Sequence, residues 1–510
     1  PKATEARRTS VELLLSNHNK DCQQCDKNGK CELLHVAQIV GAREGMYEGA
    51  KTPVTVDRLS PSIYRDTSKC ILCGRCVERC KNAHGLGILG FEKRGFNTIV
   101  APAENRSFAK SPCILCGQCV TVCPTGALME VSEIAKVDEA FAKGKYVVVQ
   151  TAPAVRAAIG EEFGDKIGTL STGKMVAALR RLGFKKVFDT NFGADLTIME
   201  EATELLGRIK ENGVLPMITS CSPGWINYCE YNYADLIPHL SSCKSPHEMF
   251  GAILKTYYAE KNGIDPKDMF VVSVMPCTAK KYEAQREELK TDGLADVDAV
   301  LTTRELGRLI RRAGIMWNRL PEEEFDNDVV GEYSGAGVIF GASGGVMEAA
   351  LRTAAKKLTG KELDDPEITG VRGLDGIKEA TYNLGGAEVR VAVAHGMKNA
   401  KVLLDEIRAG KSPYQFIEIM GCPGGCVAGG GQPYVKPCFL PNEDDDILDT
   451  YKAKRASALY KEDRMKKNRL SHENKQIIEL YDNFLGEPNS HKAHELLHTS
   501  YNADRKKFTD

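Results

Sequence analysis

Two cysteine runs of the same form constrain this chain most strongly. The runs CILCGRCVERC and CILCGQCVTVCP both follow the spacing C-x2-C-x2-C-x3-C, and the second ends in Pro124. This spacing is typical of proteins that bind two 4Fe–4S clusters, in which the fourth cysteine of each run ligates the other cluster. Zinc sites rarely use two four-cysteine runs of this form. One cluster is therefore assigned to Cys70, Cys73, Cys76 and Cys123, and the other to Cys113, Cys116, Cys119 and Cys80.

Cysteine use elsewhere also favours metal over disulfides. Eleven of the 18 cysteines lie between Cys22 and Cys123, within the first quarter of the 510 residues. The chain begins without a secretory signal pattern and has no run of about 18 apolar residues, so we expect neither export nor membrane insertion. Cys-x-x-Cys spacing without an export signal indicates metal binding. We therefore expect a cytoplasmic metalloprotein.

A third cysteine segment, HNKDCQQCDKNGKC, precedes the two runs. It contains Cys22, Cys25 and Cys31, and three cysteines need a fourth ligand. His18 lies at the end of a predicted amphipathic helix, four residues before Cys22, whereas His35 is a rival on the other side. A zinc site with three cysteines and one histidine is the alternative metal site.

Composition excludes some classes of partner. Hydrophobic residues make up 42% and charged residues 27%, which is ordinary for a globular protein with a buried core. The formal net charge of −1 gives no reason to expect nucleic acid or an anionic membrane as a partner. Because the chain begins at Pro1 rather than methionine, we expect an upstream segment.

The sequence pattern changes three times and predicts four segments. Residues 1–50 combine an amphipathic helix with the first cysteine cluster, and residues 51–140 carry the two cysteine runs. Residues 141–446 alternate apolar runs such as KYVVVQTAP and VRVAVAHG with helical patterns such as STGKMVAALRRLG. We therefore expect an α/β domain with largely parallel sheets, preceded by a short helical iron–sulfur domain and a small α+β two-cluster ferredoxin-like domain. Residues 447–510 are a Lys/Glu-rich helical tail.

Three of the apolar runs end in loops that carry cysteine. GVLPMITSCSPGW carries Cys221, MFVVSVMPCTAKKYEA carries Cys277, and YQFIEIMGCPGGCVAGGGQP carries Cys422 and Cys426. Sites in open α/β sheets form at the carboxyl ends of strands, so we expect the loops to converge. The glycines around Cys426 allow the backbone to approach a bulky inorganic group. Ordinary core packing is expected for Cys229, Cys243 and Cys438.

These loops resemble the three signature motifs of the iron-iron (FeFe) hydrogenases. The motifs read Thr-Ser-Cys-Cys-Pro-x-Trp, Met-Pro-Cys-x-x-Lys-x-x-Glu and Glu-x-Met-x-Cys-x-x-Gly-Cys-x-x-Gly-Gly-Gly-x-Pro. This chain is similar at 219–225, 275–283 and 418–433. The upstream cysteine segments match the accessory clusters of the family's larger members, which implies that His18 is a ligand. The tail SHENKQIIELYDNFLGEPNSHKAHELLHTSY resembles the family's small-subunit region, here fused.

The resemblance implies an H-cluster in residues 141–446. This cofactor is a 4Fe–4S cubane joined by one cysteine sulfur to a two-iron subsite with CO, cyanide and azadithiolate ligands. Cys277 and Cys422 are implied as cubane ligands, and Cys426 as the bridging thiolate. Lys280 is implied as the donor to one cyanide, since its charge suits an anionic ligand in a dry site. The residues implied to line the two-iron subsite are Ala152, Pro153, Met275 and Met420.

A proton relay is the second implication of the resemblance. The family uses a cysteine beside the two-iron subsite, then glutamate, serine, glutamate and a surface arginine. The spacing of the two glutamates and the arginine, three and four residues apart, predicts one helix face. Such a face is usually only solvated, but burial of a glutamate raises its pKa, which suits a proton carrier. The matching residues are Cys221, Glu201, Ser241, Glu204 and Arg208.

One position departs from the family pattern. The first motif has two adjacent cysteines, of which the second ligates the cubane, and here that second residue is Ser222. Ser222 would be a harder ligand than a thiolate and a poorer match for iron–sulfur chemistry. Alternatively Cys221 ligates the cubane and leaves the relay to Ser222 or water, or one iron stays open. Each arrangement would change the potential of the cubane.

The expected function is the reversible interconversion of H₂ with protons and electrons. Three accessory 4Fe–4S clusters would conduct the electrons, and a further cluster is possible in an upstream domain. The resemblance implies a hetero-oligomer with partner subunits that oxidise NADH or NADPH, in a bifurcating complex with ferredoxin. An H₂ sensor or a non-catalytic relative with an H-cluster-like site is the alternative, which Ser222 favours and the near-complete relay disfavours.

Overall fold

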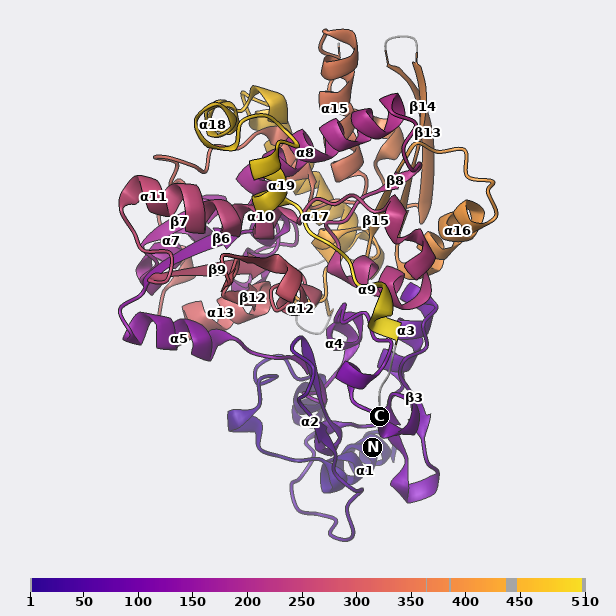
Figure 1. Cartoon of the computed structure of the whole chain (residues 1–510). Helices are drawn as coiled ribbons and strands as arrows, with labels where there is room; N and C mark the ends of the chain where they lie inside the picture. Colours follow the sequence, from indigo (N-terminus) through magenta and orange to yellow (C-terminus); the bar gives the residue numbers. More distant parts are fainter. Residues whose placement is uncertain (1, 364, 385–386, 437–446, 507–510) are drawn as a thin grey trace.

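A computed structural model describes residues 2–363, 365–384, 387–436 and 447–506 (Figure 1). The N-terminal elements are helix α1 (Lys2–Asn17), a 3-10 turn (Cys22–Gln24) and helix α2 (Glu32–Val40). The two helices pack against each other through a small apolar cluster. Helix α2 ends at Gly41, whose φ of 62° is a left-handed conformation that glycine adopts without strain.

The next segment is a small α+β unit in the lower part of Figure 1. Its elements are β1 (Val56–Asp57), β2 (Ile63–Asp66), α3 (Arg75–His84), β3 (Gly90–Glu92), β4 (Ile99–Ala101), α4 (Gln118–Val122) and β5 (Leu128–Glu130). An antiparallel sheet of order β1-β2-β5 lies beside the antiparallel ribbon β3-β4. Each cysteine run forms a loop that turns into α3 or α4 at a left-handed glycine, Gly74 or Gly117. The expected ferredoxin-like α+β class is confirmed.

The first sheet of the main domain is entirely parallel. Its strands are β6 (Tyr146–Thr151), β7 (Lys186–Asp189), β9 (Met269–Met275) and β12 (Ala299–Thr302). They lie in the order β12-β9-β6-β7, and nearly all of their residues are buried. Continuous apolar runs are what a parallel sheet buried on both faces requires. The longer helices of this half are α5 (Ile134–Ala142), α7 (Thr172–Leu182), α8 (Asn191–Lys210), α10 (Pro246–Ile253) and α13 (Thr303–Arg312).

The second sheet of the main domain is mixed. Its strands are β8 (Met217–Ile218), β13 (Ile377–Leu384), β14 (Ala387–His395) and β15 (Phe416–Met420). β13 and β14 pair antiparallel, whereas β14, β15 and β8 pair parallel. The run GVLPMITS forms only the two-residue strand β8, because Pro216 has no N–H to donate to a ladder. Of the pairings in the two main sheets, only that of β13 with β14 is antiparallel, so the prediction of largely parallel sheets is confirmed.

The remaining helices and strands of the main domain lie outside these two sheets. They are α6 (Pro153–Arg156), α9 (Pro223–Asn232), α11 (Ala259–Asn262), α12 (Ala279–Glu283), the hairpin β10 (Lys290–Thr291) and β11 (Leu294–Ala295), α14 (Gly335–Ile339), α15 (Gly345–Thr359) and α16 (Met397–Arg408). None of the helices in the described part of the chain combines the length and apolar character that a bilayer span requires.

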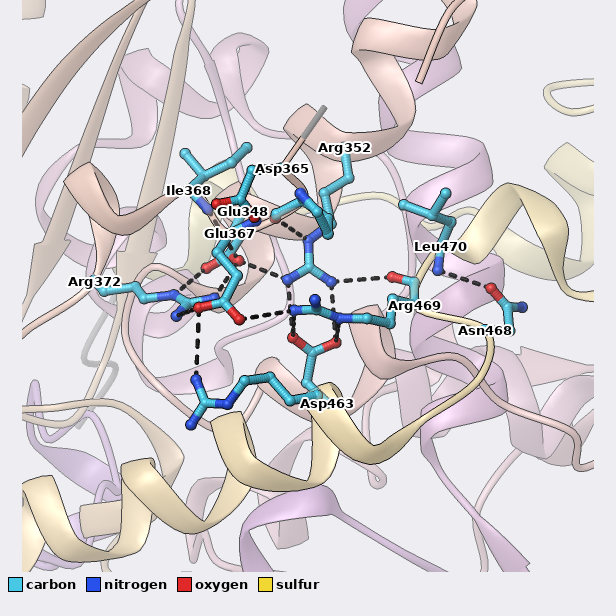
Figure 2. Close-up of polar contacts among 12 residues, drawn as sticks. Glu348, Arg352, Asp365, Glu367, Ile368, Arg372, Asp463, Asn468, Arg469 and Leu470 are labelled. Carbon is cyan, nitrogen blue, oxygen red and sulfur yellow. Dashed lines mark hydrogen bonds and ion pairs between the residues drawn. The ribbon is translucent and has the colours of Figure 1, made fainter. Parts of the chain in front are cut away.

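The C-terminal tail, drawn in yellow tones in Figure 1, folds onto the main domain. It comprises α17 (Ile447–Met465), α18 (Lys475–Leu480), which continues as a π-helical turn, and α19 (His491–Leu497). A buried ion cluster ties α17 to α15 (Figure 2): Arg352 lies 2.6 Å from Glu348 and 3.0 Å from Asp463. Because these three side chains are fully buried, each depends on its partner.

Removal of one charge from this cluster tests whether it holds the tail in place. The Asp463 carboxylate lies 3.0 Å from Arg352 and 2.6 Å from Arg469. Asp463→Asn removes this negative charge from both arginines. We expect the folded state to lose about 3–5 kcal/mol, the usual cost of breaking a buried pair. The measurement is the midpoint of urea unfolding. The control is Glu104→Gln, where the Glu104 side chain is 73% exposed and pairs with Arg106, and its expected cost is about 0–1 kcal/mol. Equal midpoints for the two variants would contradict the assignment.

Candidate active site at the converging cysteine loops

Loops from both sheets enclose one cavity of about 90 Å³. β8 leads into the loop of Cys221, β9 into that of Cys277, and β15 into that of Cys422 and Cys426. The loops thus converge at the carboxyl ends of their strands, as the strand pattern predicted. The sequence-predicted residues that lie on the cavity wall are Ala152, Pro153, Cys221, Ser222, Met275, Cys277, Lys280, Met420, Cys422 and Cys426.

The donor set of this cavity fits a bulky iron–sulfur group. Burial raises the pKa of the Cys277, Cys422 and Cys426 thiols, to about 12 for Cys426. A thiolate in such surroundings needs a compensating positive charge, which iron supplies. Gly425 has a φ of 91°, and a Cβ there would meet the Ser343 backbone nitrogen at 2.6 Å. A side chain at position 425 would therefore collide with the backbone of residues 341–343, and glycine allows the Cys426 loop to pack directly against that segment.

The two adjacent residues of the first loop face different neighbours. Ser222 Oγ accepts a hydrogen bond from Gly421 N at 3.0 Å, directly before Cys422. The Cys221 thiol lies in the electrostatic field of Glu201 and Lys280. Burial is the main reason why the pKa of this thiol is well above the ordinary value, and the negative charge of Glu201 raises the pKa further. Cys221 is therefore a neutral thiol on the side of the glutamates, and Ser222 is a hydroxyl on the side of Cys422.

Lys280 is fixed at the cavity wall by two contacts. Its Nζ donates to the Cys221 carbonyl at 3.1 Å and to Glu283 Oε2 at 2.6 Å. Burial alone would lower the pKa of Lys280, but the Glu283 carboxylate raises it above the ordinary value. The ammonium is therefore charged inside an otherwise apolar cavity, where it can bind an anionic ligand.

His247 extends this arrangement and was not anticipated from the sequence. It lines the cavity, and its Nε2 lies 2.6 Å from Glu283 Oε2. Burial lowers the pKa of His247 to about 4, so the ring is neutral. A single histidine in the run KSPHEMF has no spacing that indicates such a position.

The proposed relay residues form a row that leads away from the cavity. Arg208 Nη2 donates to Glu204 Oε1 at 2.7 Å, and Ser241 Oγ donates to Glu204 Oε2 at 3.0 Å. Glu201 is fully buried on the same face of α8, next to Ser241 and Cys221. Burial and the neighbouring Glu204 raise the pKa of Glu201 to about 8. Its carboxyl group therefore binds a proton at neutral pH.

Two further cavities match the cluster assignments of the cysteine runs. One is lined by the first three cysteines of the first run and the last cysteine of the second, namely Cys70, Cys73, Cys76 and Cys123. The other is lined by Cys80, Cys113, Cys116 and Cys119. The four sulfurs of each cavity fit one 4Fe–4S cluster, including the crossed fourth ligand.

The N-terminal histidine segment lies next to the first of these cavities. His18 is buried directly after α1, and its Nδ1 has no hydrogen-bond partner, which fits a metal ligand. Cys25 lies against Gly126, and Glu32 N donates to the Pro124 carbonyl at 2.9 Å. Cys22 and Cys31 flank these positions on the 3-10 turn and at the start of α2.

Cys116 belongs to two cavities at once, that of the second ferredoxin-like cluster and the central one. Between these two cavities, the backbone of the second cysteine run meets the backbone of the Gly430 loop without intervening side chains. A Cβ on Gly117 would meet Gly430 Cα at 3.3 Å, and a Cβ on Gly430 would overlap the Cys116 carbonyl. Thr278 Oγ1 donates across the same contact to the Leu115 carbonyl at 2.7 Å. The cavity of the second ferredoxin-like cluster therefore adjoins the central cavity directly.

His84 is a second residue that the sequence pattern did not reveal. Its Nε2 lies 3.3 Å from Cys116 Sγ, and Met397 N donates to its Nδ1 at 3.4 Å. Burial lowers the pKa of His84 to about 4, so the ring is neutral and its proton is on Nε2. The ring therefore donates to the sulfur, a contact that tunes cluster potential.

The cysteines expected in the core have different surroundings. Cys229 is fully buried, and its Sγ donates to the Tyr233 carbonyl at 3.5 Å. Cys243 is also buried, but its Sγ lies 3.9 Å from Glu204 Oε2, beside the relay. Cys438 lies outside the described residues.

Four protein families match consecutive parts of the chain. The description "NADH-ubiquinone oxidoreductase-G iron-sulfur binding region" covers residues 7–45, and "4Fe-4S dicluster domain" covers 69–127. "Iron only hydrogenase large subunit, C-terminal domain" covers 145–430, and "Iron hydrogenase small subunit" covers 449–504. The hydrogenase match alone spans more than half of the chain.

Individual proteins agree with this result. The chain is 50% identical to the NADP-reducing hydrogenase subunit HndD of Solidesulfovibrio fructosivorans, over 98% of this chain and 85% of that protein. It is 46% identical to iron hydrogenase 1 of Clostridium pasteurianum, over 97% of this chain and 85% of that protein. A solved structure of a variant of [FeFe]-hydrogenase HydA1 from Chlamydomonas reinhardtii matches with a TM-score of 0.65 and 44% identity, over 73% of this chain and 99% of that one. The chain belongs to the iron-only (FeFe) hydrogenase family, enzymes that act on H₂ at an H-cluster supplied with electrons by accessory 4Fe–4S clusters.

Proposed function

We propose that this chain is the catalytic subunit of a reversible, NADP(H)-linked hydrogenase. The observation that carries the proposal is the central cavity, where the cysteine ligands, a charged lysine and the end of a buried proton relay meet. The H-cluster supplies the redox chemistry that combines protons and electrons into H₂. The protein holds this group, excludes water from it, and delivers protons and electrons to it from different sides.

The ligand assignment follows the three loops. Cys277 and Cys422 would hold the cubane, and Cys426 would supply the thiolate shared with the two-iron subsite. The dry wall of that subsite comprises Ala152, Pro153, Met275 and Met420, which line the cavity with little polar surface. Lys280 would donate to an anionic cyanide ligand, because Glu283 maintains the positive charge of its ammonium group.

The accessory clusters would conduct electrons one at a time. The cysteine loops would place them in the order of the His18 segment, the cluster of Cys70, the cluster of Cys113 and finally the central cavity. The contacts between Glu32 and Pro124 and between Gly117 and Gly430 support this order, since they join consecutive cluster loops. Electron tunnelling slows steeply with distance, so direct backbone contacts favour rapid transfer.

Protons travel along α8. Cys221 exchanges a proton with the reacting site, and Glu201, which binds a proton at neutral pH, restores it. Ser241 lies between the two glutamates of the proposed relay: its hydroxyl donates to Glu204 Oε2 at 3.0 Å, and it is a neighbour of the buried Glu201 carboxyl, whose oxygens have no hydrogen-bond partner among the described residues. Arg208 orients Glu204 near the surface through its 2.7 Å contact. A neutral thiol and a neutral carboxyl can move protons in a buried place without creating uncompensated charge.

Ser222 is the proposed fourth ligand of the cubane, and Cys221 is the proton carrier. The hydrogen bond from Gly421 N keeps Ser222 Oγ beside Cys422, whereas the Cys221 thiol lies in the field of Glu201 and Lys280. These neighbours support the first of the three arrangements considered for this pair. An oxygen ligand is harder than sulfur and stabilises ferric iron.

The proposed partners are redox subunits that exchange electrons with NADP(H) and ferredoxin in a hetero-oligomer. The name of the HndD relative, an NADP-reducing hydrogenase subunit, supports this link. Four functional segments are proposed. They are the histidine-ligated cluster segment at 1–50, the two-cluster segment at 51–140, the H-cluster domain at 141–446, of which 437–446 lie outside the described residues, and the small-subunit-like tail at 447–510.

Activity assays on the matured protein test the function directly. We expect H₂ evolution with reduced methyl viologen as the electron donor, and infrared bands of bound CO and cyanide. Cys426→Ala should abolish both, because it removes the bridging sulfur. H₂-dependent reduction of NADP⁺ should require the partner subunits. Full infrared bands without turnover would contradict catalysis and favour an H₂-sensing role, the alternative that the departure at Ser222 supports.

The protonation of Glu201 makes the relay testable by infrared spectroscopy. Because burial and Glu204 raise its pKa to about 8, the carboxylic acid band should be present below pH 8 and disappear above it. Glu201→Gln should remove the band and lower turnover about 10²- to 10⁴-fold, the usual contribution of a positioned proton carrier. Glu204→Gln should shift the band's titration to lower pH, since it removes a negative neighbour. A band that titrates below pH 5 in the unmodified protein would refute the assignment.

Substitution of Ser222 distinguishes the possible cubane ligands. Ser222→Cys should raise the midpoint potential of the cubane, because a thiolate stabilises ferric iron less than an alkoxide does. Ser222→Ala should leave one iron open to added cyanide, detected by electron paramagnetic resonance. Cys221→Ser should keep the cubane spectrum and lose turnover. If Cys221→Ser destroys the cubane and Ser222→Cys leaves its potential unchanged, Cys221 is the ligand instead.

A further inference from the structure

The C-terminal tail runs directly along the proposed proton relay. After α19, the chain pairs with residues 242–244: Lys244 N donates to the Leu497 carbonyl at 2.8 Å, and Thr499 N donates to the Ser242 carbonyl at 2.8 Å. Cys243 and His498 form an antiparallel bridge in this pairing. The pairing fixes the position of the His498 side chain next to α8.

The imidazole of His498 connects two carboxylates of α8. Its Nδ1 lies 2.8 Å from Ser242 Oγ, and its Nε2 lies 3.0 Å from Glu200 Oε2. Ser242 Oγ in turn donates to Glu204 Oε2 at 3.4 Å. The bonds are mutually consistent for an imidazolium that donates from both nitrogens while the hydroxyl donates to Glu204. A continuous path thus runs from His498 through one hydroxyl to the relay.

Glu200 is placed as the counter-ion of this ring. It is fully buried, accepts a hydrogen bond from the Tyr481 hydroxyl, and accepts another from Asn489 N at 2.8 Å. Both donors come from the tail, so the tail supplies the histidine and also fixes the carboxylate that stabilises its charge. The titratable or charged groups around His498 are Glu200, Glu204, Cys243, Tyr481 and His494, with Lys357 near Glu200 and Arg208 on Glu204.

A second histidine links this path to the surface. The His494 ring stacks on the His498 ring with centroids 3.9 Å apart and planes 29° apart. His494 is exposed, whereas the His498 side chain is only 4% exposed. A proton bound at the outer ring can reach the inner one by rotation of the exposed ring or through one water molecule.

The arginine at the end of the row cannot itself deliver protons. A guanidinium remains charged at any pH the protein experiences, so Arg208 orients Glu204 but does not exchange protons with it. Its Nη2 also donates to the Leu240 carbonyl at 2.7 Å, which fixes it as a structural cation. The Glu204 side chain is 13% exposed, and His498 is the neighbour that can bring it a second route for protons, since histidine is the side chain whose ordinary pKa lies near neutral pH.

We propose that His498, with His494 outside it, is a proton port through which Glu204 exchanges protons with water. During uptake, imidazolium His498 gives its Nδ1 proton to Ser242 Oγ while Ser242 gives its hydroxyl proton to Glu204. In place, both ring nitrogens face Ser242 and Glu200, so the neutral ring turns its free Nδ1 towards His494, accepts a proton there through a water molecule, and turns back. The net result is the transfer of one proton from water to Glu204, and His498 acts through Glu204 as a positioning and relay residue. The proposal rests on the relay role of Glu204 in the proposed function.

The test compares histidine variants of the matured enzyme. His498→Gln keeps hydrogen-bonding groups at both ends but cannot carry a proton, and should lower H₂ evolution about tenfold or more. The inflection near neutral pH in the rate profile should disappear, while the infrared bands of CO and cyanide stay unchanged. Imidazole added to His498→Gly should restore part of the rate. His494→Gln, at an exposed position, should flatten the same inflection without affecting folding.

Glu495→Gln provides the matched control, since this residue is exposed on the same helix, and its rate and pH profile should stay unchanged. An unaltered rate and profile in His498→Gln would overturn the port. A loss that imidazole does not restore and that leaves the shape of the profile intact would show a structural role and would also overturn it. If Glu204→Gln is fully active, the relay itself fails. If Glu204→Gln is inactive and His498→Gln is fully active, only the port fails.

Discussion

The close contact between two glycine-bearing loops is the constraint on which the rest of the structure depends. Gly117 and Gly430 bring the ferredoxin-like unit against the central cavity so closely that neither position has space for a side chain. Cys116 consequently borders both the second accessory cluster and the active site. The buried pair of Arg304 and Glu130, 2.7 Å apart, holds the same interface from the other side. Electron transfer needs this proximity, so the two units must fold as one body.

Among the described residues that line the cavity, the ionisable side chains are either paired or neutral. Lys280 is balanced by Glu283, and His247 is neutral beside that carboxylate. Glu201 and Cys221 are held in their neutral forms by burial. Because an unpaired charge in a dry site is costly, neutral carriers can pass protons inward without introducing one. The burial that raises the pKa of both groups also suits them to the proposed relay.

The sequence predicted the features that depend on local spacing. The crossed pairing of the cysteine runs matches two separate cavities, and strand ends placed the cysteine loops together. The antiparallel β13 and the two-residue β8 were not predicted, because they depend on sheet partners and on Pro216. His84 and His247 were missed for the same reason: each contacts residues that are distant in sequence, and a single histidine carries no spacing pattern.

The tail illustrates how a segment outside the signature motifs becomes part of the site. Its helices are tied to the main domain by buried ions at Asp463, and its end pairs with the strand-like residues 242–244. The electron path reaches the cavity from the N-terminal units, whereas Glu204 lies on α8 beneath the tail. The proposed electron and proton routes need different side chains. Electrons need closely spaced clusters held by sulfur, whereas protons need titratable oxygen and nitrogen atoms. A tail that covers α8 can therefore control proton exchange with water without disturbing the series of clusters.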